Sequence, residues 1–88
     1  MTTKNIDLSI LPNIGKTLAM KLKAVGINTP DVLISTGSED AFIKLKTVDQ
    51  GACLNMLYVL EGAIQGIRWH DLDINKKAEL KDFFDHIK

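Results

Sequence analysis

The chain has 88 residues with 11 basic and 11 acidic side chains, so its formal net charge at neutral pH is zero. Hydrophobic residues make up 45% of the chain, close to the average of globular domains, which argues against both disorder and a disulfide scaffold. Zero net charge argues against strong nonspecific nucleic-acid binding by the whole chain, because that affinity comes largely from cations that neutralise phosphates.

A chain of this length buries enough surface for one hydrophobic core, so we expect a single domain over residues 1–88. Cys53 is the one cysteine and cannot form an internal disulfide, and no signal sequence opens the chain. We therefore expect a cytoplasmic protein. The apolar stretch from Cys53 to Ile64 is too short to cross a bilayer, so no membrane contact is expected.

Apolar and polar residues alternate over the segment Ile6 to Ile10. A period of two is typical of extended backbone. We therefore expect residues 1–10 to include an extended N-terminal arm that packs on the rest of the domain or on a second copy of the chain.

The next part of the chain contains signals for short helices. An apolar stripe predicts a first helix from Lys16 to Val25, which Gly26 ends in the left-handed conformation. Thr29 and Pro30 are an N-cap and a first helical residue, and they predict a second helix from Pro30 to Thr36. Ser38, followed by two acids, predicts the cap of a third helix that runs to about residue 46.

A central helix is predicted from Ala52 to Gln65, because this segment is apolar around most of its circumference. Its interior Gly62 costs about 1 kcal/mol relative to alanine, so we expect a neighbour to pack closely there. Asp73 predicts the cap of a last helix that runs to about Ile87. The predicted fold is therefore all-α, a single compact bundle of about five short helices.

The sequence lacks the residue patterns of common catalytic sites. His70 and His86 are the only histidines, and with Cys53 they do not have the spacing of metal ligands or of a nucleophile and its base. The Gly15-Lys16-Thr17 triplet lacks the earlier glycine of a phosphate-binding loop. We therefore expect no catalytic residue, no metal, no cofactor and no small-molecule substrate.

The segment Leu11-Pro12-Asn13-Ile14-Gly15-Lys16-Thr17 resembles the hairpin of the helix-hairpin-helix pattern found in many DNA-binding proteins. Backbone N–H groups at such a helix start lack intrahelical acceptors and can donate to a phosphate. Three lysines and no acid lie between residues 13 and 24. The candidate contacts to nucleic acid are Asn13, Gly15, Lys16, Thr17 and Lys23. The alternative is an ordinary turn followed by a solvated lysine face.

A second resemblance covers most of the chain, from about Leu8 to Leu80. The run from Cys53 to Trp69, with Leu60-Glu61-Gly62-Ala63 and Gly66 in it, follows the hairpin and Val25-Gly26-Ile27. Together these segments resemble the C-terminal domain of the TfoX (Sxy) competence regulators. The resemblance implies an all-α domain that contains the hairpin, an association with the regulation of genes for natural DNA transformation, and no enzymatic activity.

Two functions remain open at this point. The first is a helical binding module that contacts the DNA backbone through its hairpin. The second is a domain for protein interaction or homo-oligomerisation, which would use the N-terminal arm or the polar strip of the central helix. The strip residues proposed for a partner are Asn55, Tyr58, Glu61 and Gln65, for which hydrogen bonds within the domain are an equal alternative. We also expect Trp69 and Leu72 to clamp the turn before the last helix.

Overall fold

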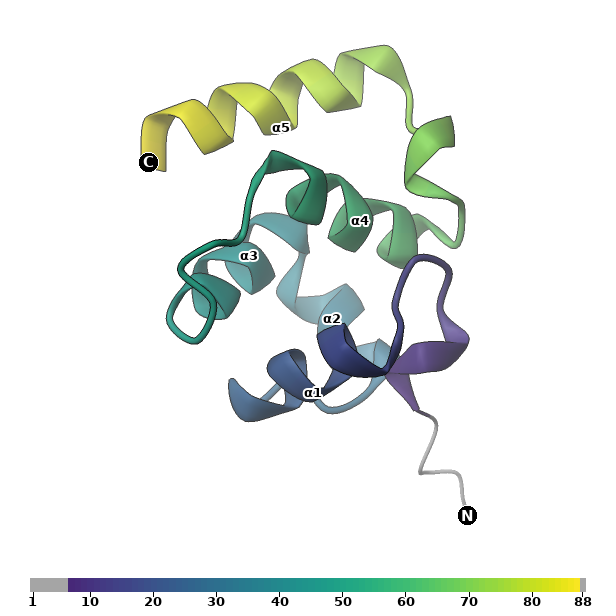
Figure 1. Cartoon of the computed structure of the whole chain (residues 1–88). Coiled ribbons are helices and arrows are strands. Elements are labelled where there is room, and N and C mark those ends of the chain that lie inside the picture. The colour runs from purple at the N-terminus through teal and green to yellow at the C-terminus, as the bar shows by residue number, and fades with distance from the viewer. Residues whose placement is uncertain (1–6, 88) are drawn as a thin grey trace.

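The computed structural model describes residues 7–87. Within this range the chain forms five α-helices and two short 3-10 turns, and no strand (Figure 1). The elements are η1 (Leu8–Ile10), α1 (Lys16–Ala24), α2 (Pro30–Thr36), α3 (Ser38–Lys46), α4 (Leu54–Gln65), η2 (Trp69–Asp71) and α5 (Ile74–Ile87). This confirms the all-α class and the five predicted helices.

Helix α4 is the centre of the bundle. It packs against α2, α3, α5 and η2, which explains why it is apolar around most of its circumference. Figure 1 shows α5 lying across one side of α4, with α1 and α2 on the opposite side. The core contains the fully buried side chains Leu8, Leu22, Ile27, Leu33, Phe42, Leu45, Leu57, Leu60 and Leu80.

Most helix ends lie where the caps predicted them. Gly26 has φ +88° and Gly66 has φ +77°, so both glycines end their helices in the left-handed conformation that side chains disfavour. Thr29 Oγ1 accepts a hydrogen bond from Val32 N at 3.3 Å and caps α2. Asp73 Oδ2 accepts one from Asn75 N at 2.9 Å at the start of α5.

Two helix starts differ from the prediction. The N-cap of α3 is Gly37, with φ +87°, and Ser38 is the first helical residue instead of the cap. Helix α4 begins at Leu54 and not at Ala52, because Ala52 N donates to Asp49 O in a preceding turn and Cys53 is extended. A turn bond therefore took precedence over the apolar pattern at α4, and at α3 a glycine with positive φ took the cap position predicted for the serine.

The expectation of an extended arm is wrong for residues 8–10. Asp7 Oδ1 accepts a hydrogen bond from Ser9 N at 2.9 Å and caps the 3-10 turn η1, whose Leu8 is completely buried. Within residues 7–10 only Leu8 enters the core, while Ile10 is 66% exposed, so the alternation does not reflect an extended segment with one buried face. Residues 1–6 lie outside the described part of the chain.

None of the helices in residues 7–87 combines the length and the hydropathy that a membrane span requires.

Candidate nucleic-acid interface

The start of α1 is an open helix N-terminus. Gly15 is its N-cap, no side chain caps it, and its first turn contains no acid. The N–H groups of Lys16, Thr17 and Leu18 make no hydrogen bond with any described residue. A Cβ built at Gly15 would meet nothing within 4 Å, and Gly15, Lys16 and Thr17 are exposed. Such a helix end has the geometry and the partial positive charge that suit an anion.

Asn13 does not share this exposed position. Its φ is +73°, and its side chain points into the domain. Asn13 Nδ2 donates to Ile67 O at 3.0 Å and lies 3.5 Å from Val59 O, while Asn13 Oδ1 accepts from Trp69 N at 3.2 Å. The Asn13 amide is thus occupied by backbone groups of α4 and the turn after it, and we remove it from the candidate phosphate contacts.

Gly62 makes room for this contact. A Cβ at Gly62 would lie 2.6 Å from Asn13 Nδ2, 2.9 Å from Ile67 O and 3.0 Å from Trp69 Cα. The first two distances are shorter than real Cβ contacts show, and the third lies at that limit. The close neighbour expected at the helical glycine is therefore the hairpin itself, together with the turn that Asn13 holds.

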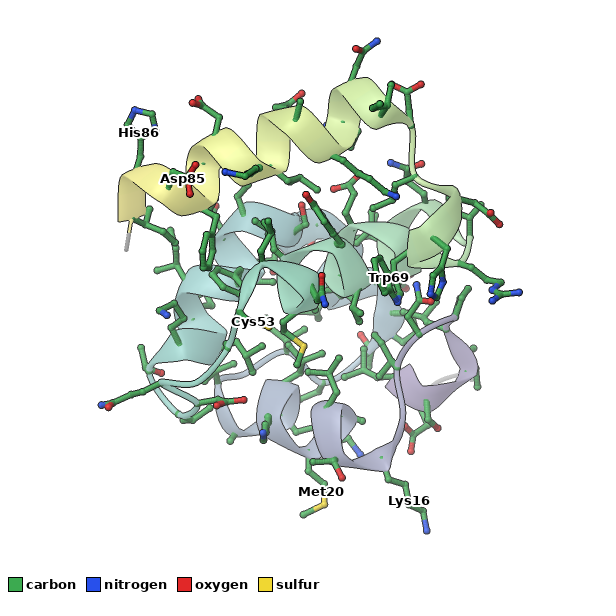
Figure 2. All side chains as sticks on the ribbon, turned by 45° about the horizontal axis from the view of Figure 1, so that its top comes forward. Lys16, Met20, Cys53, Trp69, Asp85 and His86 are labelled. Atoms are coloured by element: carbon green, nitrogen blue, oxygen red, sulfur yellow. The ribbon has the colours of Figure 1, made fainter. Side chains whose placement is uncertain are left out.

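The lysines of α1 differ in their pairing. Lys16 and Lys23 line the same surface hollow of about 290 Å³, together with Met20. In Figure 2, Lys16 and Met20 point away from the bundle at the same edge of the molecule. Lys23 Nζ lies 3.8 Å from Asp7 Oδ2, whereas Lys16 makes no ion pair with the described residues.

Lys21 is the best-paired lysine of this helix. Its Nζ lies 2.8 Å from Asp49 Oδ2, in the loop before α4, and this hydrogen bond lowers the pKa of the Asp49 carboxyl. The pKa of Asp7 is also lowered, chiefly by the backbone hydrogen bond from Ser9 N and further by Lys23 and Lys16. Folding thus brings two acids, distant in sequence, to the three lysines. The positive charge of this face is smaller than the sequence suggested.

A second hollow, of about 330 Å³, runs from the start of α1 towards α4. Helix α4 contributes the apolar side chains of Met56 and Val59 to its lining, and α1 contributes two lysines. The residues that line it are Asn13, Gly15, Lys16, Thr17, Leu18, Lys21, Met56 and Val59. Gly15, Lys16 and Thr17 therefore lie together at one solvent-accessible edge.

The polar strip of α4 is largely engaged within the domain. Glu61 Oε1 accepts from Ser38 Oγ at 2.6 Å, and Glu61 Oε2 accepts from Gln65 Nε2 at 2.7 Å. Tyr58 Oη donates to Lys77 O at 3.4 Å. Asn55 remains exposed. Three of the four residues proposed for a partner thus have intradomain partners, and Glu61 contacts the start of a neighbouring helix through Ser38.

The turn before α5 is clamped as expected, but unevenly. Leu72 is buried, while Trp69 is only half-buried and packs beside the rings of Tyr58 and His70. Met20 and Ile43 are apolar side chains on the surface, 70% and 45% exposed.

No cluster of three or more His, Cys, Asp or Glu side chains suited to a metal ion occurs in residues 7–87. Cys53 is an exposed free thiol at the N-cap of α4, and His86 lies near the end of α5 (Figure 2). His86 Nδ1 donates to Asp82 O at 2.7 Å, and this hydrogen bond raises the pKa of His86.

Sequence reasoning missed the roles of Asp7, Asp49 and Ser38, because their partners are 16 to 28 residues away in the chain. The inward turn of Asn13 had two sequence signals. An asparagine two residues before the glycine of the hairpin is a residue type that tolerates a left-handed backbone. The second signal was Gly62 in the middle of α4, because a side chain at that position would collide with the Asn13 amide.

Comparison with known proteins agrees with this geometry. Two crystal structures of Listeria monocytogenes proteins are similar to the chain, both at 51% identity and a TM-score of 0.89. One is described as an uncharacterized protein, and the match covers 91% of each chain. The other is described as a protein of unknown function, with 92% of this chain and 99% of that chain covered. No match was found among curated proteins. The model of the TfoX C-terminal domain matches residues 4–84, and the chain therefore belongs to the TfoX C-terminal domain family.

Proposed function

We propose that this domain is a non-enzymatic binding module that contacts the DNA phosphate backbone through the start of α1, in the regulation of competence and DNA transformation. The observation that carries the proposal is the open N-terminus of α1, where three unbonded N–H groups lie next to Lys16. The family membership supports the regulatory context.

The physical basis is the combination of neutral donors and one unpaired cation. A phosphate at this helix end would accept from the N–H groups and lie at the positive end of the helix dipole. Lys16 would neutralise part of its charge. Asp7 and Asp49 pair with the other two lysines of the helix, so few phosphates are bound and the affinity is modest. Such contacts carry little sequence preference.

The test is fluorescence anisotropy of a labelled DNA duplex at about 50 mM and 200 mM salt. We expect the double variant Lys16→Glu/Lys23→Glu to bind at least about tenfold more weakly than the wild type at the lower salt. A matched control is Lys44→Glu/Lys81→Glu, which changes the net charge equally on α3 and α5 and should bind as the wild type does. Equal, poor binding by the wild type and by Lys16→Glu/Lys23→Glu at the lower salt would refute the proposal.

Protein interaction is the second candidate function, and one observation favours it. Met20 is 70% exposed between Lys16 and Lys23, and an exposed methionine on a mixed charged face suits a protein contact. Light scattering over a concentration series tests self-association. We expect Met20→Lys to abolish it without altering the melting temperature if this candidate is correct, and a strictly monomeric wild type would count against it.

A further inference from the structure

Three rings lie side by side next to the hairpin. The Trp69 and His70 rings stack with centroids 4.1 Å apart and planes 29° apart. Tyr58 lies on the same row, with its centroid 6.1 Å from Trp69 and the two planes 22° apart. We call Tyr58, Trp69 and His70 the aromatic row. His70, at its end, is exposed, whereas Tyr58 and Trp69 are half-buried.

Cations border this row. Lys77 Nζ lies 6.0 Å from the Tyr58 centroid and 5.9 Å from the Trp69 centroid, and it donates to His70 O at 3.4 Å. Arg68 precedes the row, is exposed, and makes no ion pair with the described residues. The nearby acid Asp73 is occupied in capping α5. Asp71 is exposed, and the two acids together offset the two cations in formal charge, so charge alone does not determine what binds here.

Hydrogen bonds from Asn13 connect the aromatic row to the hairpin that leads into the candidate phosphate site. Asn13, at the tip of the hairpin, bonds to Ile67 O and Trp69 N on either side of Arg68. Two residues further along the chain, Gly15 opens α1. The position of the aromatic row relative to a phosphate at the start of α1 is therefore set by these bonds.

From this arrangement we infer that the aromatic row binds an unpaired nucleobase, which stacks on the exposed face of His70 while Arg68 contacts the adjoining phosphate. The inference rests on the proposed function and specifies its ligand as single-stranded DNA. In a duplex the faces of each base are covered by its neighbours. Only an unstacked base offers a face to an aromatic side chain.

The experiment uses the one tryptophan of the chain as a reporter. The probes are an oligothymidylate of about 12 nucleotides and a duplex of the same length, titrated by anisotropy and, unlabelled, by Trp69 emission. We expect the single strand to bind more tightly than the duplex and to alter Trp69 emission. Because stacking of a base is worth about 1–3 kcal/mol, His70→Ala should weaken single-strand binding about fivefold or more. Duplex binding should change less than about twofold.

Two further variants sharpen the result. His70→Phe keeps a stacking ring and should retain single-strand affinity, and His86→Ala removes the other histidine from a distant exposed site on α5 and should change nothing. Single-strand binding that His70→Ala leaves unaltered, or that falls equally for both DNA forms, would overturn the inference. Duplex binding that depends on Lys16, with no response of Trp69 to the single strand, would overturn it and leave the proposed function intact. Failure of both DNA forms to bind would remove both proposals.

Discussion

Asn13 and Trp69 are 56 residues apart in the chain, yet Asn13 Oδ1 accepts a hydrogen bond from Trp69 N at 3.2 Å. Through this bond and the one from Asn13 Nδ2 to Ile67 O, the hairpin before α1 is fixed to the turn after α4. Asn13, a predicted phosphate contact, therefore holds the hairpin in place. The N–H groups at the start of α1 are the ones left free to bind a phosphate.

Two substitutions of Asn13 distinguish the contribution of its side-chain hydrogen bonds to stability from that of its left-handed backbone conformation. Asn13→Gly permits the observed φ of +73° but removes the bonds to Ile67 and Trp69, and we expect it to lower the free energy of unfolding by about 1–3 kcal/mol. Asn13→Ala should cost about 1 kcal/mol more, because alanine disfavours the left-handed region. Urea unfolding of both variants measures the difference. Equal stability of Asn13→Gly and the wild type would show that the bonds contribute nothing.

Gly62→Ala tests the same contact from the side of α4. Alanine is normally favoured over glycine inside a helix, by about 1 kcal/mol. Here the added methyl group would meet Asn13 Nδ2 at 2.6 Å and two backbone atoms at 3.0 Å or less. We expect a net loss of about 1–3 kcal/mol, measured by thermal or urea unfolding.

Gly51→Ala is the control for that substitution. A Cβ at Gly51 would have Asp49 Oδ1 as its nearest neighbour, at an ordinary 3.5 Å. Its stability should stay within about 0.5 kcal/mol of the wild type. A Gly62→Ala protein more stable than the wild type would mean that the hairpin and the turn after α4 move away from the added methyl group at little cost in free energy.

Ser38 is the only buried polar residue in the described range, and its hydroxyl donates to Glu61 Oε1 at 2.6 Å. Ser38→Ala leaves that carboxylate oxygen without its donor, so we expect a loss of about 1–2 kcal/mol in the free energy of unfolding. In a double-mutant cycle with Glu61→Ala, the two effects should be less than additive, since each substitution removes the hydrogen bond between Ser38 and Glu61. Strict additivity would contradict the contact.

The ion pair of Lys21 with Asp49 predicts a specific dependence of stability on pH. The pKa of Asp49 is held below its ordinary value of 3.8 in the folded protein by the hydrogen bond from Lys21. The stabilisation is therefore fully present above that ordinary value and is lost as the pH falls through the lowered folded pKa. We expect Asp49→Asn to be less stable than the wild type near neutral pH, and the difference to shrink in acid.

Urea unfolding at a series of pH values measures this difference. Lys21→Gln removes the same ion pair from the other side and should show the same pH profile as Asp49→Asn. A difference between wild type and Asp49→Asn that stayed constant from neutral pH down to about pH 2 would exclude the carboxylate as its source.

Much of the fold could be predicted, because the ends of its helices depend on capping residues that are close in the sequence. Gly26, Gly66, Thr29 and Asp73 act within one turn of their own positions, and each ended or began a helix where predicted. The start of α3 shows the limit of this reasoning. A serine before two acids is a good cap, but Gly37 took that position, and the hydroxyl of Ser38 bonds to α4.

The candidate site was predictable only in part, for a similar reason. The open edge of Gly15, Lys16 and Thr17 follows from the local hairpin pattern. The orientation of Asn13 and the acids beside Lys21 and Lys23 depend on segments brought together by the fold. No periodicity of the sequence reports such contacts between distant segments.

The hydrophobic core is built mostly of leucine, with alanine as the next most frequent residue. Side chains of such uniform shape fit one another in several ways, and cores of this kind readily lose a unique arrangement and become molten. Directional bonds do not have this freedom. Asn13 can meet Ile67 O and Trp69 N, and Ser38 can meet Glu61, in only one register of the helices. These few polar contacts therefore select a single packing from the many that the leucines alone would permit.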